Sequence, residues 1–132
     1  MLRYLLDTNI CIYVIKRRPA QMLERFNRHS GHMAISAITL SELLHGVEKS
    51  AAPDRNLTVV ENFCGRLEVL PYGGKACLHY GQIRAGLERQ GLPIGVTDLH
   101  IAAHARSEGL TLVSNNLREF QRVDGLLLDN WA

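Results

Sequence analysis

The chain has 132 residues, a length that predicts one domain spanning residues 1–132. Hydrophobic residues make up 46% and charged residues 21%, which excludes a disordered protein, and no apolar run approaches the roughly 20 residues of a membrane span. A net charge of +2 does not by itself indicate nucleic-acid binding, nor does it oppose a polyanionic partner. The three widely spaced cysteines (Cys11, Cys64, Cys77) predict reduced thiols in a cytoplasmic protein, with no disulfide framework or zinc site, and no export signal is expected.

Short apolar runs alternate with helical patterns along the chain. The first run ends at Asp7, and Thr8 or Asn9 is expected to cap the helix that follows. The remaining strands are expected at Met33–Ile35, Leu67–Leu70, Thr111–Ser114 and Leu126–Leu128, and the helices at Ile10–Lys16, from Pro19, at Ala37–Lys49, from Pro53, at Lys75–Gln90 and, capped by Thr97, at Asp98–Glu108. This order predicts an α/β fold, with a short, mostly parallel central sheet flanked by helices on both faces.

Asp7 is the first candidate site residue. We expect it at the carboxyl end of a central strand, where open α/β sheets build their sites. An Asp-Thr-Asn sequence is also a common helix cap, although Thr8 or Asn9 could cap the helix without an acid before them. Position alone therefore leaves a structural and a catalytic role for Asp7 equally open.

Asp98 gives a stronger signal. On a helical wheel it lies in line with Ala102 and Ala105 and beside Ile101, on the face that should be buried. A first-turn carboxylate gains roughly 0.3–1 kcal/mol from the helix dipole, but this gain would be as large on the solvent side. A partly buried carboxylate needs a stronger partner, and this favours a function for Asp98.

Three further polar residues give weaker signals. Glu42 lies on a polar helix face with His45 and Lys49, where a glutamate is ordinarily only solvated. Asn116 follows the end of a strand, where turn formation is a sufficient reason for an asparagine. Glu119 lies one helical turn beyond Asn116 and could reach the same place.

If these acids converge, their repulsion must be relieved by a proton, by an arginine or lysine, or by a divalent cation. Two like charges ~4 Å apart cost about 4 kcal/mol at an effective dielectric constant of 20. Oxygen ligands without cysteine or paired histidines predict Mg²⁺ or Mn²⁺ rather than zinc. Carboxylates, a hard cation and scattered basic residues together suggest phosphodiester hydrolysis.

Four segments resemble, in order and spacing, the motifs of the PIN-domain ribonucleases. They are Leu6-Asp7-Thr8-Asn9, Ser36-x-x-Thr39-x-x-Glu42-Leu43, Asp98-x-x-Ile101-Ala102-Ala103-His104-Ala105, and the run from Leu112 to Phe120. The resemblance covers essentially the whole chain and, within the family, is to VapC toxins of bacterial type II toxin–antitoxin systems. It implies a PIN-like fold.

The resemblance also implies a metal site carried by Asp7, Glu42 and Asp98, with a fourth position near the end of the chain. Many family members have Asp where this chain has Asn116. The departure leaves open whether Asn116 serves, whether Glu119 supplies the charge, or whether three acids suffice.

Further implications concern substrate and partners. The resemblance implies cleavage of structured RNA, often tRNA and also rRNA, and neutralisation by a VapB antitoxin that binds operator DNA. It also implies a homodimer. The first helix and the apolar stripe after Pro19 are candidate antitoxin contacts, although both could simply pack into the core.

The resulting hypothesis is a Mg²⁺-dependent endoribonuclease in which Asn116 and Glu119 assist the three acids. The candidates for holding the RNA backbone are Lys16, Arg17, Arg18 and Lys49. One alternative is a phosphatase or phosphotransferase with Asp7 as nucleophile, although Asn9 stands where haloacid-dehalogenase-type enzymes need a second acid. Another is a non-catalytic module that only binds metal.

Overall fold

The computed structural model describes residues 1–131 and shows a five-stranded parallel sheet. The strand order is β3-β2-β1-β4-β5, so the first strand is the central one, as predicted. The strands are β1 (Tyr4–Leu6), β2 (Met33–Ser36), β3 (Glu68–Leu70), β4 (Thr111–Val113) and β5 (Leu128–Asp129). Because all pairs are parallel, the residues that follow each strand meet at the same edge of the sheet.

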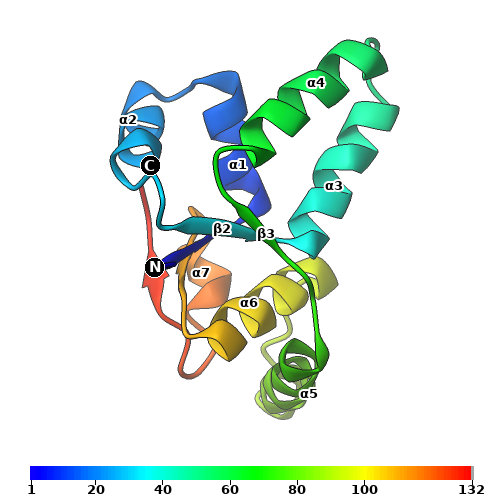
Figure 1. Ribbon diagram of the computed structural model, residues 1–132. Coiled ribbons are helices and arrows are strands. Elements are labelled where there is room, and N and C mark those ends of the chain that lie inside the picture. Colours follow the sequence, from blue (N-terminus) through cyan, green and yellow to red (C-terminus); the bar gives the residue numbers. More distant parts are fainter. Residues whose placement is uncertain (132) are drawn as a thin grey trace.

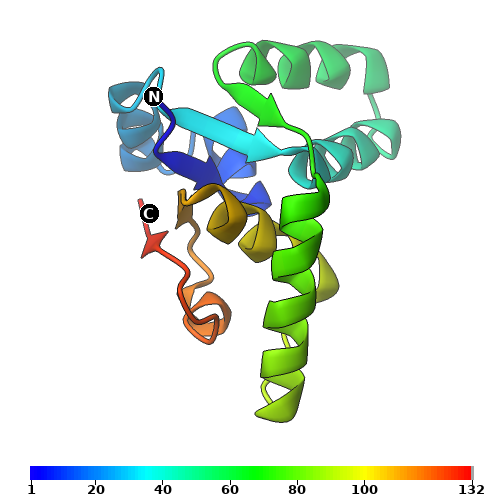
Figure 2. The same cartoon turned by 60° about the horizontal axis from the view of Figure 1, so that its bottom comes forward.

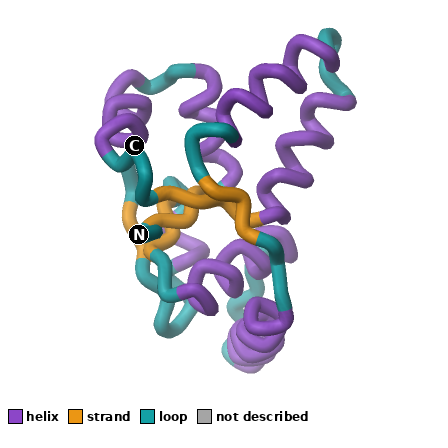
Figure 3. The backbone as a smooth tube through the Cα atoms, viewed as in Figure 1, coloured by secondary structure: helices purple, strands orange, loops and turns teal. Residues whose placement is uncertain are grey.

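Seven helices connect and cover these strands within residues 1–131 (Figure 1). They are α1 (Thr8–Lys16), α2 (Ala20–Arg28), α3 (Ala37–Glu48), α4 (Pro53–Cys64), α5 (Gly74–Arg89), α6 (Val96–Glu108) and α7 (Leu117–Phe120). The strands form a thin central layer with helices on both sides (Figure 3). Figure 2 shows α5 extending away from the sheet beyond the end of β3. The predicted α/β architecture is confirmed.

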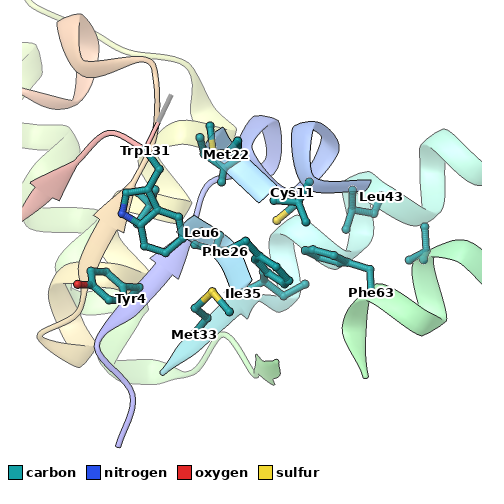
Figure 4. Packing of buried hydrophobic residues seen from close by; sticks show 14 of the residues in the cluster. Tyr4, Leu6, Cys11, Met22, Phe26, Met33, Ile35, Leu43, Phe63 and Trp131 are labelled. Carbon is teal, nitrogen blue, oxygen red and sulfur yellow. The ribbon is translucent and has the colours of Figure 1, made fainter. Parts of the chain in front are cut away.

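Each face of the sheet packs into its own hydrophobic cluster. On one face, Leu6 and Ile35 meet α1 to α4, and Phe26 stacks on Phe63 with ring centroids 5.6 Å apart (Figure 4). On the other face, Leu5 and Leu112 meet α5, α6 and α7. Each fully buried side chain of this size contributes about 1.5–3 kcal/mol relative to its exposed state. Alternation along β1 therefore anchors the residue that follows it, Asp7, between two packed layers.

The remaining elements agree with the sequence patterns apart from local shifts and the short helix α7, which was not predicted. Gly109 ends α6 with a left-handed φ of 66°, which glycine adopts without strain. The last strand lies at Leu128–Asp129 and not at Leu126–Leu128, because only Leu128 and Asp129 pair with β4. Among the described residues, no helix has both the length and the apolar character needed to cross a bilayer.

Candidate active site

Asp7 lies at the carboxyl end of the central strand and is only 3% exposed. Its Oδ1 accepts a hydrogen bond from the backbone N–H of Thr8 at 2.8 Å, and its Oδ2 accepts one from the hydroxyl of Ser114 at 2.8 Å. Asp7 is therefore the N-cap of α1, and the prediction that Thr8 or Asn9 caps this helix is wrong. Asp7 therefore has the structural role that its position left open, because each of its oxygens accepts a hydrogen bond at the edge of the sheet.

Glu42 is exposed on the second turn of α3 and is held by α1. The Thr8 hydroxyl donates to its Oε1 at 2.5 Å. The hydroxyl of buried Thr39 lies 3.1 Å from that of Thr8. Since the single Thr8 proton goes to Glu42, the Thr39 hydroxyl donates to Thr8. A relay of two hydroxyls thus brings Glu42 to the end of α1 where Asp7 lies.

Asp98 lies in the first turn of α6 and is half-buried, as its position on the helical wheel predicts. The helix begins two residues earlier than expected from Thr97, because its N-cap is Gly95 and no side chain caps it. The prediction that Thr97 caps this helix is therefore wrong. The amino ends of α1, α3 and α6 all lie beside the carboxyl edge of the sheet (Figure 1), so each helix brings one acid to the same region.

Asn116 connects Asp98 and Glu119. Its amide Nδ2 lies 3.5 Å from Asp98 Oδ2 and 3.4 Å from Glu119 Oε2, and it donates to both carboxylates over these long distances. Its backbone N–H donates to the Ser114 hydroxyl at 2.9 Å. The five predicted residues are therefore assembled by hydroxyl and amide groups into one hydrogen-bonded edge.

The acids of this region raise one another's proton affinity. Burial raises the pKa of Asp98 to about 6, and the charges of Asp7 and Glu119 add to this effect. Burial also raises the pKa of Asp7, although its hydrogen bonds from Ser114 and Thr8 partly oppose the increase. The ion pairs among the described residues, Arg28–Glu24, Lys75–Glu108 and Arg84–Glu88, include none of the site acids. The site therefore carries unneutralised negative charge.

The chemistry of this donor set fits a hard divalent cation. Carboxylate and amide oxygens are the ligands that Mg²⁺ and Mn²⁺ prefer, and the repulsion between the acids is what a cation relieves. Within residues 1–131, no three His, Cys, Asp or Glu side chains form a ready-made metal cluster. The carboxylates are near one another but are held apart by Thr8, Ser114 and Asn116.

The four basic residues predicted to hold RNA lie away from the acids. Lys16 is the last residue of α1, and Arg17 caps that helix with a left-handed φ of 58°. At 1.5 Å per residue, this places them about 14 Å along the helix from Asp7. Lys49 caps α3 seven residues, or about 10 Å, beyond Glu42. These residues, together with the exposed Arg18, surround the acids at a distance and do not contact them.

Two positioning residues were not singled out from the sequence. Ser114 was named only as the last residue of an expected strand, yet its hydroxyl bridges Asp7 and Asn116. Thr39 supports the Thr8 hydroxyl that holds Glu42. The signal that could have identified both is a polar residue at a buried position, since each is 0% exposed.

Comparison with known proteins places the chain in a family. A family model described as PIN domain matches residues 4–126. The protein is 59% identical over 132 residues to the "Ribonuclease VapC2" of Haemophilus influenzae, with full coverage of both chains. It is 55% identical, again over the full length of both, to the "tRNA(fMet)-specific endonuclease VapC" of Shigella flexneri.

The fold also matches solved structures of toxin–antitoxin complexes. The DNA-bound VapBC of Salmonella typhimurium gives a TM-score of 0.96 at 55% identity and covers all of both chains. VapBC2 of Rickettsia felis, bound to a DNA fragment from its promoter, gives a TM-score of 0.93 at 40% identity and covers 99% of this chain and 100% of that one. Sequence, fold and the acidic edge of the sheet agree, and the chain belongs to the VapC ribonucleases of the PIN-domain family.

Proposed function

We propose that this protein is the toxin of a toxin–antitoxin pair, a Mg²⁺- or Mn²⁺-dependent endoribonuclease that cleaves structured RNA in the cytoplasm and so inhibits translation. The observation that carries the proposal is the gathering of Asp7, Glu42, Asp98 and Glu119 at one edge of the sheet without a basic partner. tRNA is the first candidate substrate, because a relative with 55% identity is named a tRNA(fMet)-specific endonuclease. rRNA is the second.

In this proposal Asp7, Glu42 and Asp98 hold the cation, which when bound offsets the charge of the phosphate and lowers the pKa of a water molecule. The chain itself fixes the carboxylates. Ser114 orients Asp7 through Oδ2, and Thr8 orients Glu42 through Oε1. Asp98, with a pKa of about 6, takes up a proton more readily than an ordinary carboxyl, and a cation beside it would favour its ionised form.

The fourth position belongs, in this proposal, to Glu119 and Asn116 together. Glu119 supplies the negative charge that an asparagine lacks. The Asn116 amide donates toward both Glu119 and Asp98 and so keeps the two carboxylates within reach of one another. The Asn116 side chain thus separates the two carboxylates without adding charge, and its oxygen remains available as a neutral ligand for a cation.

The distant basic residues are assigned to the RNA backbone. Basic side chains near the acidic edge can contact the phosphates of a bound RNA. Such contacts position the nucleic acid without selecting its sequence. Lys49 lies along α3 beyond Glu42, and Lys16 to Arg18 lie along α1 beyond Asp7. We assign the first contact to Lys49 and a more distant one to Lys16, Arg17 and Arg18.

A VapB-type antitoxin is the proposed regulator. A groove of about 510 Å³ lies between α1, α2 and α4, and its lining includes Val14, Leu23, Val59 and Phe63 with Arg66 beside them. An amphipathic segment with apolar and acidic residues fits such a groove. The matched VapBC structures are toxin–antitoxin complexes bound to DNA, which supports a similar complex on operator DNA, contacted through VapB. We also propose that the toxin forms a homodimer.

The alternative functions are less well supported. A phosphatase with Asp7 as nucleophile would need a second acid two residues further on, and Asn9 occupies that position. A module that binds metal without catalysis is disfavoured by full-length identity of 55–59% to proteins named ribonucleases and endonucleases.

The proposal is tested with purified protein, Mg²⁺ and separate pools of tRNA(fMet), elongator tRNA and rRNA. We expect cleavage of tRNA(fMet) that a chelator abolishes and that Asp7→Asn and Asp98→Asn each abolish. Asp54→Asn is the matched control, because Asp54 is an exposed acid in the first turn of α4, outside the site. Cleavage by the Asp7→Asn and Asp98→Asn proteins at the rate of the Asp54→Asn protein would refute the assigned site.

A further inference from the structure

His104 belongs to the third sequence motif, yet the acidic site does not use it. It lies on α6, six residues after Asp98, and is 1% exposed. Its Nδ1 is 2.8 Å from the hydroxyl oxygen of Ser36, and its Nε2 has no hydrogen-bond partner among the described residues. A buried imidazole with one engaged nitrogen needs an explanation, because an unsatisfied buried group costs about 1–3 kcal/mol.

The bond to Ser36 determines the form of the imidazole. Ser36 Oγ already accepts a hydrogen bond from the backbone N–H of Ile38 at 3.1 Å, which caps α3. The hydroxyl proton of Ser36 is therefore free to donate, and Nδ1 of His104 is the acceptor within reach. Burial lowers the pKa of His104 below its ordinary value, which favours the neutral ring. If Nδ1 instead donated to Ser36 Oγ, the hydroxyl proton of Ser36 would have no acceptor, in addition to the unpaired Nε2 of His104.

This bond connects two helices that carry acids of the site. Ser36 is the last residue of β2 and the N-cap of α3, the helix of Glu42. His104 lies on α6, the helix of Asp98, and the two helices pack against each other. The Tyr72 ring packs against His104 at a centroid distance of 5.4 Å and an interplanar angle of 80°, which restricts its motion. One buried hydrogen bond thus links the residue that begins α3 to α6.

We propose that His104 is a positioning residue that acts through Ser36 to hold Glu42 at the distance from Asp98 at which both can bind one divalent cation. Glu42 itself is exposed and depends on its neighbours for placement, since its partner is the Thr8 hydroxyl. Loss of the Ser36–His104 bond lets the start of α3 move, and Glu42 moves with it. This inference rests on the proposed metal site of Asp7, Glu42 and Asp98.

The test measures Mn²⁺ binding by electron paramagnetic resonance on the protein without RNA, together with Mg²⁺-dependent RNA cleavage. His104→Leu removes the acceptor while keeping an apolar side chain of similar length. His104→Asn retains an acceptor near the place of Nδ1. Changes in groups that orient metal ligands lower affinity or activity by about 10–100-fold, so we expect His104→Leu to weaken Mn²⁺ binding about tenfold. We expect His104→Asn to bind within about threefold of the unchanged protein.

Ser36 supplies the second half of the test. Ser36→Ala removes the bond to His104 and also the cap of α3, so it should weaken Mn²⁺ binding at least as much as His104→Leu does. The double variant should be no worse than Ser36→Ala alone, because the bond to His104 is already lost in that variant. Ser36→Thr, which keeps the hydroxyl, is the matched control. If the His104→Leu protein does not fold, Ser36→Ala compared with Ser36→Thr and His104→Asn gives the result alone.

The outcomes separate this inference from the proposed function. Glu42→Gln is measured beside the other variants. If Glu42→Gln abolishes Mn²⁺ binding while His104→Leu and Ser36→Ala bind as the unchanged protein does, the positioning role is refuted and the site stands. The positioning role would also be refuted if the losses of Mn²⁺ affinity in the two single variants multiplied in the double variant. If Glu42→Gln binds Mn²⁺ and cleaves RNA normally, the proposed site itself is refuted.

Discussion

The two ends of α1 lie in opposite environments. At its amino end, Asp7 is buried among other carboxylates, and its hydrogen bonds come from Thr8 and Ser114. At its carboxyl end, Lys16 and Arg17 are exposed beside a groove with a largely apolar lining. One end carries negative charge, and the other presents apolar side chains with basic residues beside them.

This difference indicates how one short helix can serve both catalysis and inhibition. The amino end needs rigid hydroxyl and amide partners, because like charges must be kept near one another until a cation binds. The carboxyl end needs only shape and apolar area, which a partner segment can cover. With about 14 Å between the two ends, a segment of VapB bound in the groove is within a few residues of the acids. Each prediction below changes a residue that lies near one end of α1 and leaves the surroundings of the other end unchanged.

The largest effect is expected at the fourth position of the acidic end. Glu119→Gln removes the charge that, in the proposed site, replaces the usual aspartate, while it keeps the acceptor for the Asn116 amide. We expect RNA cleavage to fall by about 100-fold, the upper range for groups that support a metal site. Asn116→Asp in the same background should restore part of the activity. Equal cleavage by Glu119→Gln and the unchanged protein, measured with tRNA at several Mg²⁺ concentrations, would show that three acids suffice.

The next effect is expected at the groove end. Val59 is 40% exposed and lines the groove, so Val59→Arg places a charge in the antitoxin path without disturbing the core. Loss of a buried apolar contact at an interface costs about 2 kcal/mol, or roughly 30-fold in affinity for VapB. Titration calorimetry with the antitoxin gives the affinity, and RNA cleavage without antitoxin should be unchanged.

Leu57 provides the matched control for this prediction. It is on the same helix and 39% exposed, but it does not line the groove. Leu57→Arg should therefore bind VapB as the unchanged protein does. Equal weakening by the two variants would move the antitoxin contact away from the groove.

A smaller effect is expected from Ser114, which connects Asp7 to Asn116. Ser114→Ala leaves Asp7 Oδ2 buried without a donor, and an unsatisfied buried acceptor costs about 1–3 kcal/mol. We expect a lower denaturant midpoint with an unchanged m-value, and cleavage reduced about tenfold. Ser107→Ala, which removes the hydroxyl that donates to the His104 carbonyl on α6, is the control for loss of a hydroxyl elsewhere. Equal stability of both variants would show that Ser114 does not support Asp7.

The comparison of the two ends also explains what the sequence could predict. Asp7 and Asp98 were identifiable because strand ends and helix faces follow from local periodicity. The position of β1 at the centre of the sheet follows from the same alternation of strands and helices. The Thr8–Glu42 bond was not predictable, because residues 34 positions apart meet only once α1 and α3 have packed.

The local errors have a similar origin. Capping by Thr97 was expected because threonine is a common N-cap, but Val96 already belongs to α6 and Gly95 precedes it. Capping by Thr8 or Asn9 was expected because Asp7 was assigned to the metal alone, whereas a carboxylate has two oxygens and Asp7 uses one of them for the cap. Sequence patterns thus predicted which polar residues gather at this edge of the sheet but not the hydrogen bonds that orient them.

The smallest effect concerns the stability cost of the acidic end, measured in chelator so that no cation contributes. Burial raises the pKa of Asp98 to about 6, above the ordinary value of about 3.9 in an unfolded chain. The folded state therefore binds the proton more tightly, and ionised Asp98 destabilises the fold fully above pH 6, progressively less between pH 6 and pH 4, and not below that. Because Asp98 is only half-buried, solvent screening reduces the cost to about 1 kcal/mol. Asp98→Asn should therefore raise the melting temperature by roughly 4 °C at pH 7.5, and this gain should shrink as the pH falls toward 4. A gain that is independent of pH would mean that asparagine stabilises α6 for another reason, and the two ends of α1 would then not differ in stored electrostatic repulsion.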